Sequence, residues 1–140
     1  MSTFTAQPRV GEVEAPDSFV LAAQDTGKFN LFKIGEELEP VSDGFFNQLG
    51  MIYKMEMISN TLDHPDYKFV LGTNNGIAFL HINKNNYAMQ LSKEHYLPGK
   101  VVNNLLLRGQ RVITFVHDSQ KFCVIDRKTK EIMDIHWLEN

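Results

Sequence analysis

A hairpin pattern occurs more than once along this chain. Residues 69–82, FVLGTNNGIAFLHI, are two short apolar runs on either side of Asn74-Asn75-Gly76, and residues 19–34, FVLAAQDTGKFNLFKI, repeat them. Residues 111–126, RVITFVHDSQKFCVID, are a third copy. Short runs rich in Val, Ile and Phe, joined by residues that tolerate positive φ, are typical of antiparallel hairpins. The chain is therefore predicted to build one supersecondary unit several times.

The turns of these hairpins are expected to differ. Asn75-Gly76 is predicted to form a two-residue turn whose backbone matches the strand twist, and Thr26-Gly27 the same in the first copy. The third copy has HDSQK in this place, without glycine, which predicts a longer turn.

The spacing of the copies narrows the choice of fold. Phe69 follows Phe19 by 50 residues and Val112 follows Phe69 by 43. Repeats of about 40 to 50 residues with about four strands each are typical of β-propeller blades. We attribute the longer first interval to a loop insertion between Gly35 and Gly50, with residues 62–66 as a second place for part of it.

We therefore predict an all-β fold, made of short antiparallel four-stranded blades in an incomplete β-propeller ring. The expected organisation is a flexible N-terminal lead-in over residues 1–17, with one strand near residues 10–13, then a partial propeller over residues 18–140 with blades near 18–50, 51–92 and 101–137. The segment SDGFFNQLGMI from Ser42 predicts one short helical turn. A β-sandwich or a small barrel is the alternative, since the same alternation and turn spacing suit both.

The segment KFCVIDRKTKEIMDI, residues 121–135, resembles the WD-repeat type of β-propeller. Ile125 and Asp126 stand where that family commonly has Trp and Asp at the end of a third strand, and Ile82 and Asn83 are their equivalents in the second copy. The Gly-His pair usual in that family is absent from all copies. The resemblance covers most of residues 18–137 and implies a rigid platform for binding proteins.

The number of blades leaves three possibilities open. Propellers typically have 4 to 8 blades, whereas this chain supplies about three. An unclosed stack of blades leaves flat faces and strand edges uncovered, which favours association. The chain is a piece of a longer protein, or it closes a ring of six blades with a copy of itself, or a partner supplies the rest.

Composition excludes several classes of partner. The formal net charge is -3, and the 14 Lys and Arg residues are spread along the chain, which predicts no binding to nucleic acid or to an anionic membrane. We predict a cytoplasmic or nuclear protein. The sequence has one cysteine and no Asn-x-Ser/Thr glycosylation acceptor, its start does not resemble a secretion signal, and no apolar run is long enough for a membrane span.

No residue pattern indicates catalysis, a cofactor or a metal site, so we predict that the protein is not an enzyme. The five histidines are 14 to 22 residues apart, and none has a local metal-ligand spacing: His64, His81, His95, His117 and His136. Cys123 lies between Phe122 and Val124 in a predicted strand, where a buried thiol is expected to act as a small apolar side chain.

Two segments are candidates for binding a partner. Phe45 and Phe46, next to Gly44 in the expected loop, would anchor another protein if their rings were exposed, or would fill the edge of the core if they were not. KEHYLPGK, residues 93–100, would present His95, Tyr96 and Leu97 in a similar way, or would be an ordinary link between blades.

The expected function is a non-catalytic protein-protein interaction or scaffold module, within a larger assembly or a longer propeller protein. Its partner is expected to be another protein, or a second copy through the open blade edges. The alternative is a propeller that binds a small ligand or glycan and forms by self-association, for which the single Trp and four Tyr offer few stacking platforms.

Overall fold

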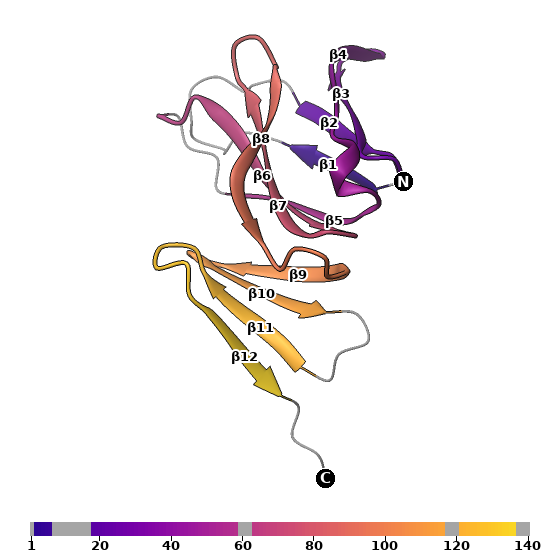
Figure 1. Cartoon of the computed structure of the whole chain (residues 1–140). Coiled ribbons are helices and arrows are strands. Elements are labelled where there is room, and N and C mark those ends of the chain that lie inside the picture. The colour runs from indigo at the N-terminus through magenta and orange to yellow at the C-terminus, as the bar shows by residue number, and fades with distance from the viewer. Residues whose placement is uncertain (1, 7–17, 59–62, 117–120, 137–140) are drawn as a thin grey trace.

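The computed structural model describes residues 2–6, 18–58, 63–116 and 121–136. It contains three separate sheets of four strands, and each strand pairs antiparallel with its neighbour in the sequence (Figure 1). The first blade consists of β1 (Ser2–Ala6), β2 (Ser18–Ala23), β3 (Lys28–Ile34) and β4 (Leu38–Phe45). The second consists of β5 (Ile52–Met57), β6 (Asp66–Thr73), β7 (Gly76–Asn83) and β8 (Met89–Tyr96). The third consists of β9 (Val102–Arg108), β10 (Arg111–Val116), β11 (Lys121–Asp126) and β12 (Ile132–His136).

The three sheets are arranged as consecutive blades. The first strands of neighbouring sheets contact each other, β1 with β5 and β5 with β9, and the last strands β4 and β8 are also in contact. The prediction of four-stranded blades in an incomplete propeller is confirmed. The alternative of a sandwich or a closed barrel is wrong, because the described strands form three sheets that each keep their own edges.

The core lies between the blades, in two clusters. In the second blade, Phe69 and Leu71 belong to the cluster shared with the first blade, whereas Val70 and Phe79 belong to the cluster shared with the third. Successive residues of a strand point to opposite faces, so this blade is apolar on both of its faces. That is why its strands read as continuous apolar runs in the sequence.

The hairpin turns differ in length. In the second blade Thr73 pairs with Gly76, so the two turn residues are Asn74 and Asn75, one position earlier than expected. Gly76 has φ of 79°, and a side chain there would collide with the carbonyl oxygens of Tyr96 and Leu97. The first hairpin has a longer turn over residues 24–27, with φ of 85° at Gly27. The turn of the third hairpin lies outside the described residues.

The first blade differs most from expectation. The expected loop insertion between Gly35 and Gly50 is wrong, because it contains the outer strand β4. None of the residues of β4 is buried and one is Pro40, which suits an edge strand but hides it from a search for apolar alternation. The predicted helical turn is confirmed as η1 (Asn47–Leu49).

The N-terminal segment contains a strand where a lead-in was expected. Residues 2–6 form β1, which pairs with β2. The strand that we expected near residues 10–13 lies outside the described residues. The first blade therefore begins at residue 2 in the structure, earlier than residue 18.

Candidate functional site

Each blade has two faces, and we name them by what they meet. The leading face is turned toward the preceding blade in the chain, and the trailing face toward the following blade. In each blade the last Ile of the third strand lies on the leading face: Ile34, Ile82 and Ile125. Ile82 and Ile125 are 0% exposed because a preceding blade covers them, whereas Ile34 is 38% exposed. The outer part of the leading face of the first blade is therefore uncovered in the described structure, whereas Ala22 nearer its centre is buried.

Apolar side chains continue across this uncovered leading face. Leu38 is paired with Ile34, so the two side chains share a face, and Leu38 is 59% exposed. Phe45 pairs with Lys28 on the same face and is the most exposed large apolar residue of the described chain, at 63%. The opposite side of this sheet, which carries Phe29 and Leu31, is buried against the second blade.

The trailing face of the third blade is the second uncovered surface. Directly opposite residues on neighbouring strands share a face, so the pairing places seven apolar side chains together there: Leu106, Ile113, Phe115, Phe122, Val124, Met133 and Ile135. The same pairing adds Asn104 opposite Phe115, and Arg108, Arg111 and Asp126 at one end. Leu106 is 40% exposed and Met133 is 62% exposed. The equivalent trailing-face residues of the second blade, such as Phe79 at 1%, are covered.

This trailing face has a hollow near its outer edge. The hollow has a volume of about 470 Å³ and is lined by Arg111, Val124, Asp126, Glu131, Ile132 and Met133. Deeper on the same face, the rings of Phe115 and Phe122 lie with centroids 5.7 Å apart. The surface therefore combines an aromatic pair with a depression that has charged groups at its rim.

The structure separates the two phenylalanines that the sequence analysis singled out. Phe45 projects from the first blade, whereas the Phe46 ring packs against the first core cluster, 6.0 Å from the ring of Phe29. The Phe46 backbone N–H also donates to Gly27 O. Of this pair, only Phe45 belongs to an accessible surface.

The segment with His95, Tyr96 and Leu97 is only partly a loop. His95 and Tyr96 are the last residues of β8, and the expected exposure of Tyr96 is wrong, because Tyr96 is 6% exposed and meets Phe79 edge to face. Leu97 packs against the second core cluster and has φ of 57°. His95 is exposed and forms a hydrogen bond with Asn75 O. Tyr96 is thus covered through its contact with Phe79, although Lys93 and Lys100 lie near it in the sequence.

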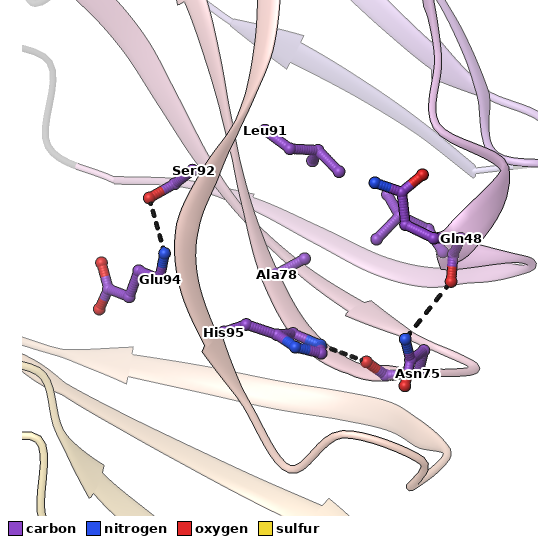
Figure 2. Close-up of a pocket in the computed structure, with 8 residues that line it drawn as sticks. Gln48, Asn75, Ala78, Leu91, Ser92, Glu94 and His95 are labelled. Carbon is purple, nitrogen blue, oxygen red and sulfur yellow. Dashed lines mark hydrogen bonds between the residues drawn. The ribbon is translucent and has the colours of Figure 1, made fainter.

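A second hollow lies where β8 departs from regular pairing (Figure 2). Its register against β7 shifts between the pairs Ala78–His95 and Leu80–Leu91, and Ser92 Oγ accepts from Glu94 N at 3.0 Å within the irregular stretch. The hollow has about 320 Å³ and is lined by Gln48, Leu49, Asn75, Ala78, Leu91, Ser92, Glu94 and His95. None of these is Trp or Tyr, so the hollow has no platform on which a sugar would stack.

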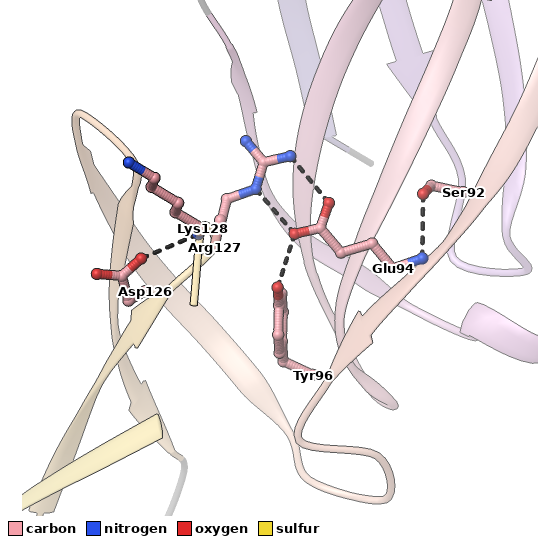
Figure 3. A network of polar contacts seen from close by, with 6 residues as sticks. All are labelled: Ser92, Glu94, Tyr96, Asp126, Arg127 and Lys128. Atoms are coloured by element: carbon pink, nitrogen blue, oxygen red, sulfur yellow. Dashed lines mark hydrogen bonds and ion pairs between the residues drawn. The ribbon is translucent and has the colours of Figure 1, made fainter. Parts of the chain in front are cut away.

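A polar network connects the second and third blades (Figure 3). Glu94 accepts two hydrogen bonds from Arg127, both at 2.9 Å, and one from Tyr96 Oη at 2.7 Å. The guanidinium carbon of Arg127 also lies 4.5 Å from the ring centre of Phe79. Bidentate pairing of this kind is both strong and directional.

The ionisation of this network follows from its contacts. Burial disfavours the charged form of Glu94, but the hydrogen bonds from Arg127 and Tyr96 outweigh it and hold the pKa below its usual range. Burial and the hydrogen bond to Glu94 raise the pKa of Tyr96 to about 12. The carboxylate is therefore fully engaged in holding two blades together. Sequence reasoning missed the network because its acid and base are 33 residues apart and belong to different blades.

The residues that carried the resemblance to WD repeats do equivalent work in two blades. Asp126 Oδ1 accepts from Lys128 N at 2.9 Å, and Asn83 Oδ1 accepts from Asn85 N at 2.8 Å. Both residues end a third strand and close the turn that follows. Their expected equivalence is confirmed.

The described residues contain no group of three or more His, Cys, Asp or Glu side chains that could hold a metal ion. Cys123 is buried, as expected, and lies 3.1 Å from Asp134 Oδ1. Among the same residues there is no helix with the length and apolarity needed to cross a membrane.

Comparison with known proteins supports the fold and goes no further. No protein-family model and no curated protein matches the chain. Among solved structures, the WD40 domain of SCAP from fission yeast is similar, with a TM-score of 0.57 and 10% sequence identity. The match covers 96% of this chain and 34% of that chain. The chain therefore has the fold of β-propeller blades and spans about a third of the length of this neighbour.

Proposed function

We propose that this chain is a non-catalytic protein-protein interaction module that works as part of a larger assembly by binding proteins through its uncovered blade faces. The observation that carries the proposal is the trailing face of the third blade, where seven apolar side chains lie together and none of them is buried. Large contiguous apolar patches on a protein surface mark interaction sites.

The energetic argument rests on burial of this surface. Each square ångström of apolar surface removed from water contributes about 25 cal/mol. Phe115, Met133 and Leu106 keep between 36% and 62% of their surface in water. A protein that covered this face would bury them as the third blade itself buries Phe79, which is 1% exposed. The covering surface is expected to be sheet-like and apolar, as another blade is.

Two further features support a binding role over a catalytic one. Glu94, the carboxylate at the second hollow, is ion-paired with Arg127 and accepts a hydrogen bond from Tyr96 Oη, so it is a poor general base. Phe45, exposed at the edge of the first blade, extends the accessible apolar surface to the other end of the molecule. Aromatic side chains in such positions commonly carry much of the energy of an interface.

Site-specific photo-crosslinking in the cells from which the chain comes tests this function. A photoreactive amino acid replaces Met133 on the trailing face, and a matched one replaces the exposed Asn85 in the turn after β7. We expect a crosslinked polypeptide, identified by mass spectrometry, at position 133 and not at position 85. The crosslink should be lost when Phe115→Glu places a charge beside the same site.

Two results would show that the trailing face does not bind a protein. If position 133 yields no crosslinked polypeptide, or if Phe115→Glu leaves the crosslink unchanged while the chain stays folded, the trailing face is not a protein-binding surface. A circular dichroism spectrum of the Phe115→Glu variant verifies its folding.

A further inference from the structure

We infer that the partner on these faces is a second copy of the chain, with the trailing face of the third blade of each copy on the leading face of the first blade of the other. This inference rests on the proposed function and names its partner. The two copies would close a ring of six blades around a twofold axis.

The polarity of the existing interfaces supports this pairing. Both core clusters join a trailing face to a leading face, first blade to second and second blade to third. The two surfaces left uncovered are one of each kind. A second copy therefore offers the half of the contact that each end of the first copy lacks. Such contacts are heterologous, and they end in a closed ring when the rotation permits closure.

The leading face of the first blade has apolar residues at the same positions as the leading face of the second blade, which packs against the first. In the second blade, Ile82 pairs with Met89, and both pack in the cluster against the first blade. In the first blade, the equivalent pair is Ile34 with Leu38, at the same place between the third and fourth strands. This pair is exposed, although its counterpart is covered.

The charges at one end of the two uncovered faces are complementary. The turn after β3 carries exposed Glu36 and Glu37, and exposed Glu39 follows at the start of β4, opposite Lys33; we call these three the acidic turn. At the same end of the third blade, exposed Arg108 and Arg111 flank the turn after β9, and exposed Lys128 and Lys130 lie in the turn after β11; we call these the basic turns.

Nearby charges of the opposite sign leave the acidic turn net negative and the basic turns net positive. The acidic turn has Lys33 beside it, and the basic turns have Asp126 and Glu131. Asp126 is engaged with the Lys128 backbone N–H and lies 3.9 Å from Arg111. If the two copies meet as the blades within one copy do, trailing face on leading face, ring closure would bring the acidic turn of one copy toward the basic turns of the other. Complementary charges of this kind select the partner and its register.

A ring of six blades also agrees with the number of blades found in closed propellers. Closed propellers typically have 4 to 8 blades, so two copies of three fall within the range. In the closed ring no blade face remains uncovered, and growth stops at two copies.

Sedimentation equilibrium of the purified chain, over a dilution series, tests the inference with charge-reversal variants. The wild-type chain, of 16.1 kDa, is expected to sediment with twice that mass. Reversal of the acidic turn (E36K, E37K, E39K) or of the basic turns (R111E, K128E, K130E) should raise the dimer dissociation constant by at least about tenfold, since rim charge pairs contribute up to about 1 kcal/mol each and repulsion replaces them. The chain that carries all six reversals should dimerise again.

Recovery of the dimer in the chain with all six reversals would show that the single-side reversals break a specific charge contact and do not unfold the chain. Lys93→Glu, on the exposed side of β8 in the second blade, is the control and should leave the mass unchanged. A wild-type chain that stays monomeric at every concentration overturns the inference, as does a sixfold variant that fails to dimerise while its circular dichroism spectrum is native. If the chain is monomeric but position 133 crosslinks to a different protein, this inference fails and the proposed function stands. If neither dimer nor crosslink is found, both fail.

Discussion

The second and third blades have the same four-stranded architecture but different surroundings. The second is covered on both faces, and its trailing-face residue Phe79 is 1% exposed. The third is covered on its leading face alone in the described structure, and its trailing-face residue Phe115 is 36% exposed. Yet both trailing faces are largely apolar, with Asn104 and the charged residues at one end as the polar part of the third blade's face. A blade whose outer face met water in its working state would be expected to alternate apolar with polar residues, as half-covered antiparallel sheets do. The large difference in cover, beside a small difference in composition, supports the proposal that another protein covers the third blade in its working state.

The largest effect should come from truncating the aromatic residues that distinguish the two faces. Phe79→Ala removes a fully buried ring that also lies beneath Arg127, so the free energy of unfolding should fall by about 3 to 5 kcal/mol. Phe115→Ala, on the uncovered face, should cost less than about 1.5 kcal/mol when the chain is dilute. Urea unfolding of both variants measures the two values. Equal losses would mean that Phe115 is as well packed as Phe79, and the comparison would fail.

A matched pair of isoleucines tests the other end of the molecule. Ile82 and Ile34 occupy equivalent leading-face positions, at 0% and 38% exposed. Ile82→Ala should lower the free energy of unfolding by about 2 to 4 kcal/mol, and Ile34→Ala by about 1 kcal/mol in the dilute chain. At high chain concentration the gap should narrow, because the inferred second copy covers Ile34. A gap that is independent of concentration would argue against cover by another copy.

The network between the second and third blades should contribute a smaller amount. Arg127→Met leaves the carboxylate of Glu94 without its bidentate donor, and we expect a loss of about 2 kcal/mol in the free energy of unfolding. Lys54→Met, in the second blade, is the control, because the Lys54 side chain is 42% exposed and lies 3.9 Å from Glu56, and it should change stability by less than about 0.5 kcal/mol. Equal effects in urea unfolding would show that the Arg127 network does not hold the blades together.

The smallest expected effect is the loss of stability at acidic pH that His81 contributes. Burial and the charge of Lys68 lower the pKa of His81, although Asp66, 3.7 Å away, opposes this; His64 and Arg127 add to the lowering. The fold therefore favours the neutral imidazole. This contribution is complete above the ordinary pKa of about 6.5 and is lost as the pH falls below it.

His81→Gln should flatten the dependence of stability on pH below the ordinary histidine pKa of about 6.5, and His95→Gln, at an exposed position, serves as the control. Thermal unfolding at several pH values gives the comparison. A slope that persists in His81→Gln would assign it to other groups.

The sequence was sufficient to predict the parts of the fold that repeat locally. The hairpins, the Ile-Asp and Ile-Asn pairs that end third strands, and the short helical turn all depend on neighbours within a few residues. The outer strand β4 was missed because an edge strand with Pro40 and no buried residue has no apolar signature. The blade interfaces could not be predicted, since Arg127 and Glu94 meet only after two blades have packed.

The candidate surface was predicted only in part. Phe45 was found from its loop-like neighbours, but Tyr96 was misjudged because its flanking lysines hide the fact that it faces Phe79. The seven apolar residues of the trailing face could not be told from core residues in the sequence. Only the structure shows that no described blade covers them.

Hydroxyl-radical footprinting of methionines tests the central claim most directly. Met133 on the trailing face is 62% exposed and Met55 in the first core cluster is 6% exposed, so in the dilute purified chain Met133 should oxidise much faster. In the cells from which the chain comes, we expect Met133 to be protected to the level of Met55, because another protein or a second copy covers the face. Equal rapid oxidation of Met133 in the cell and in the dilute chain would show that the face stays open to water, and would contradict the account.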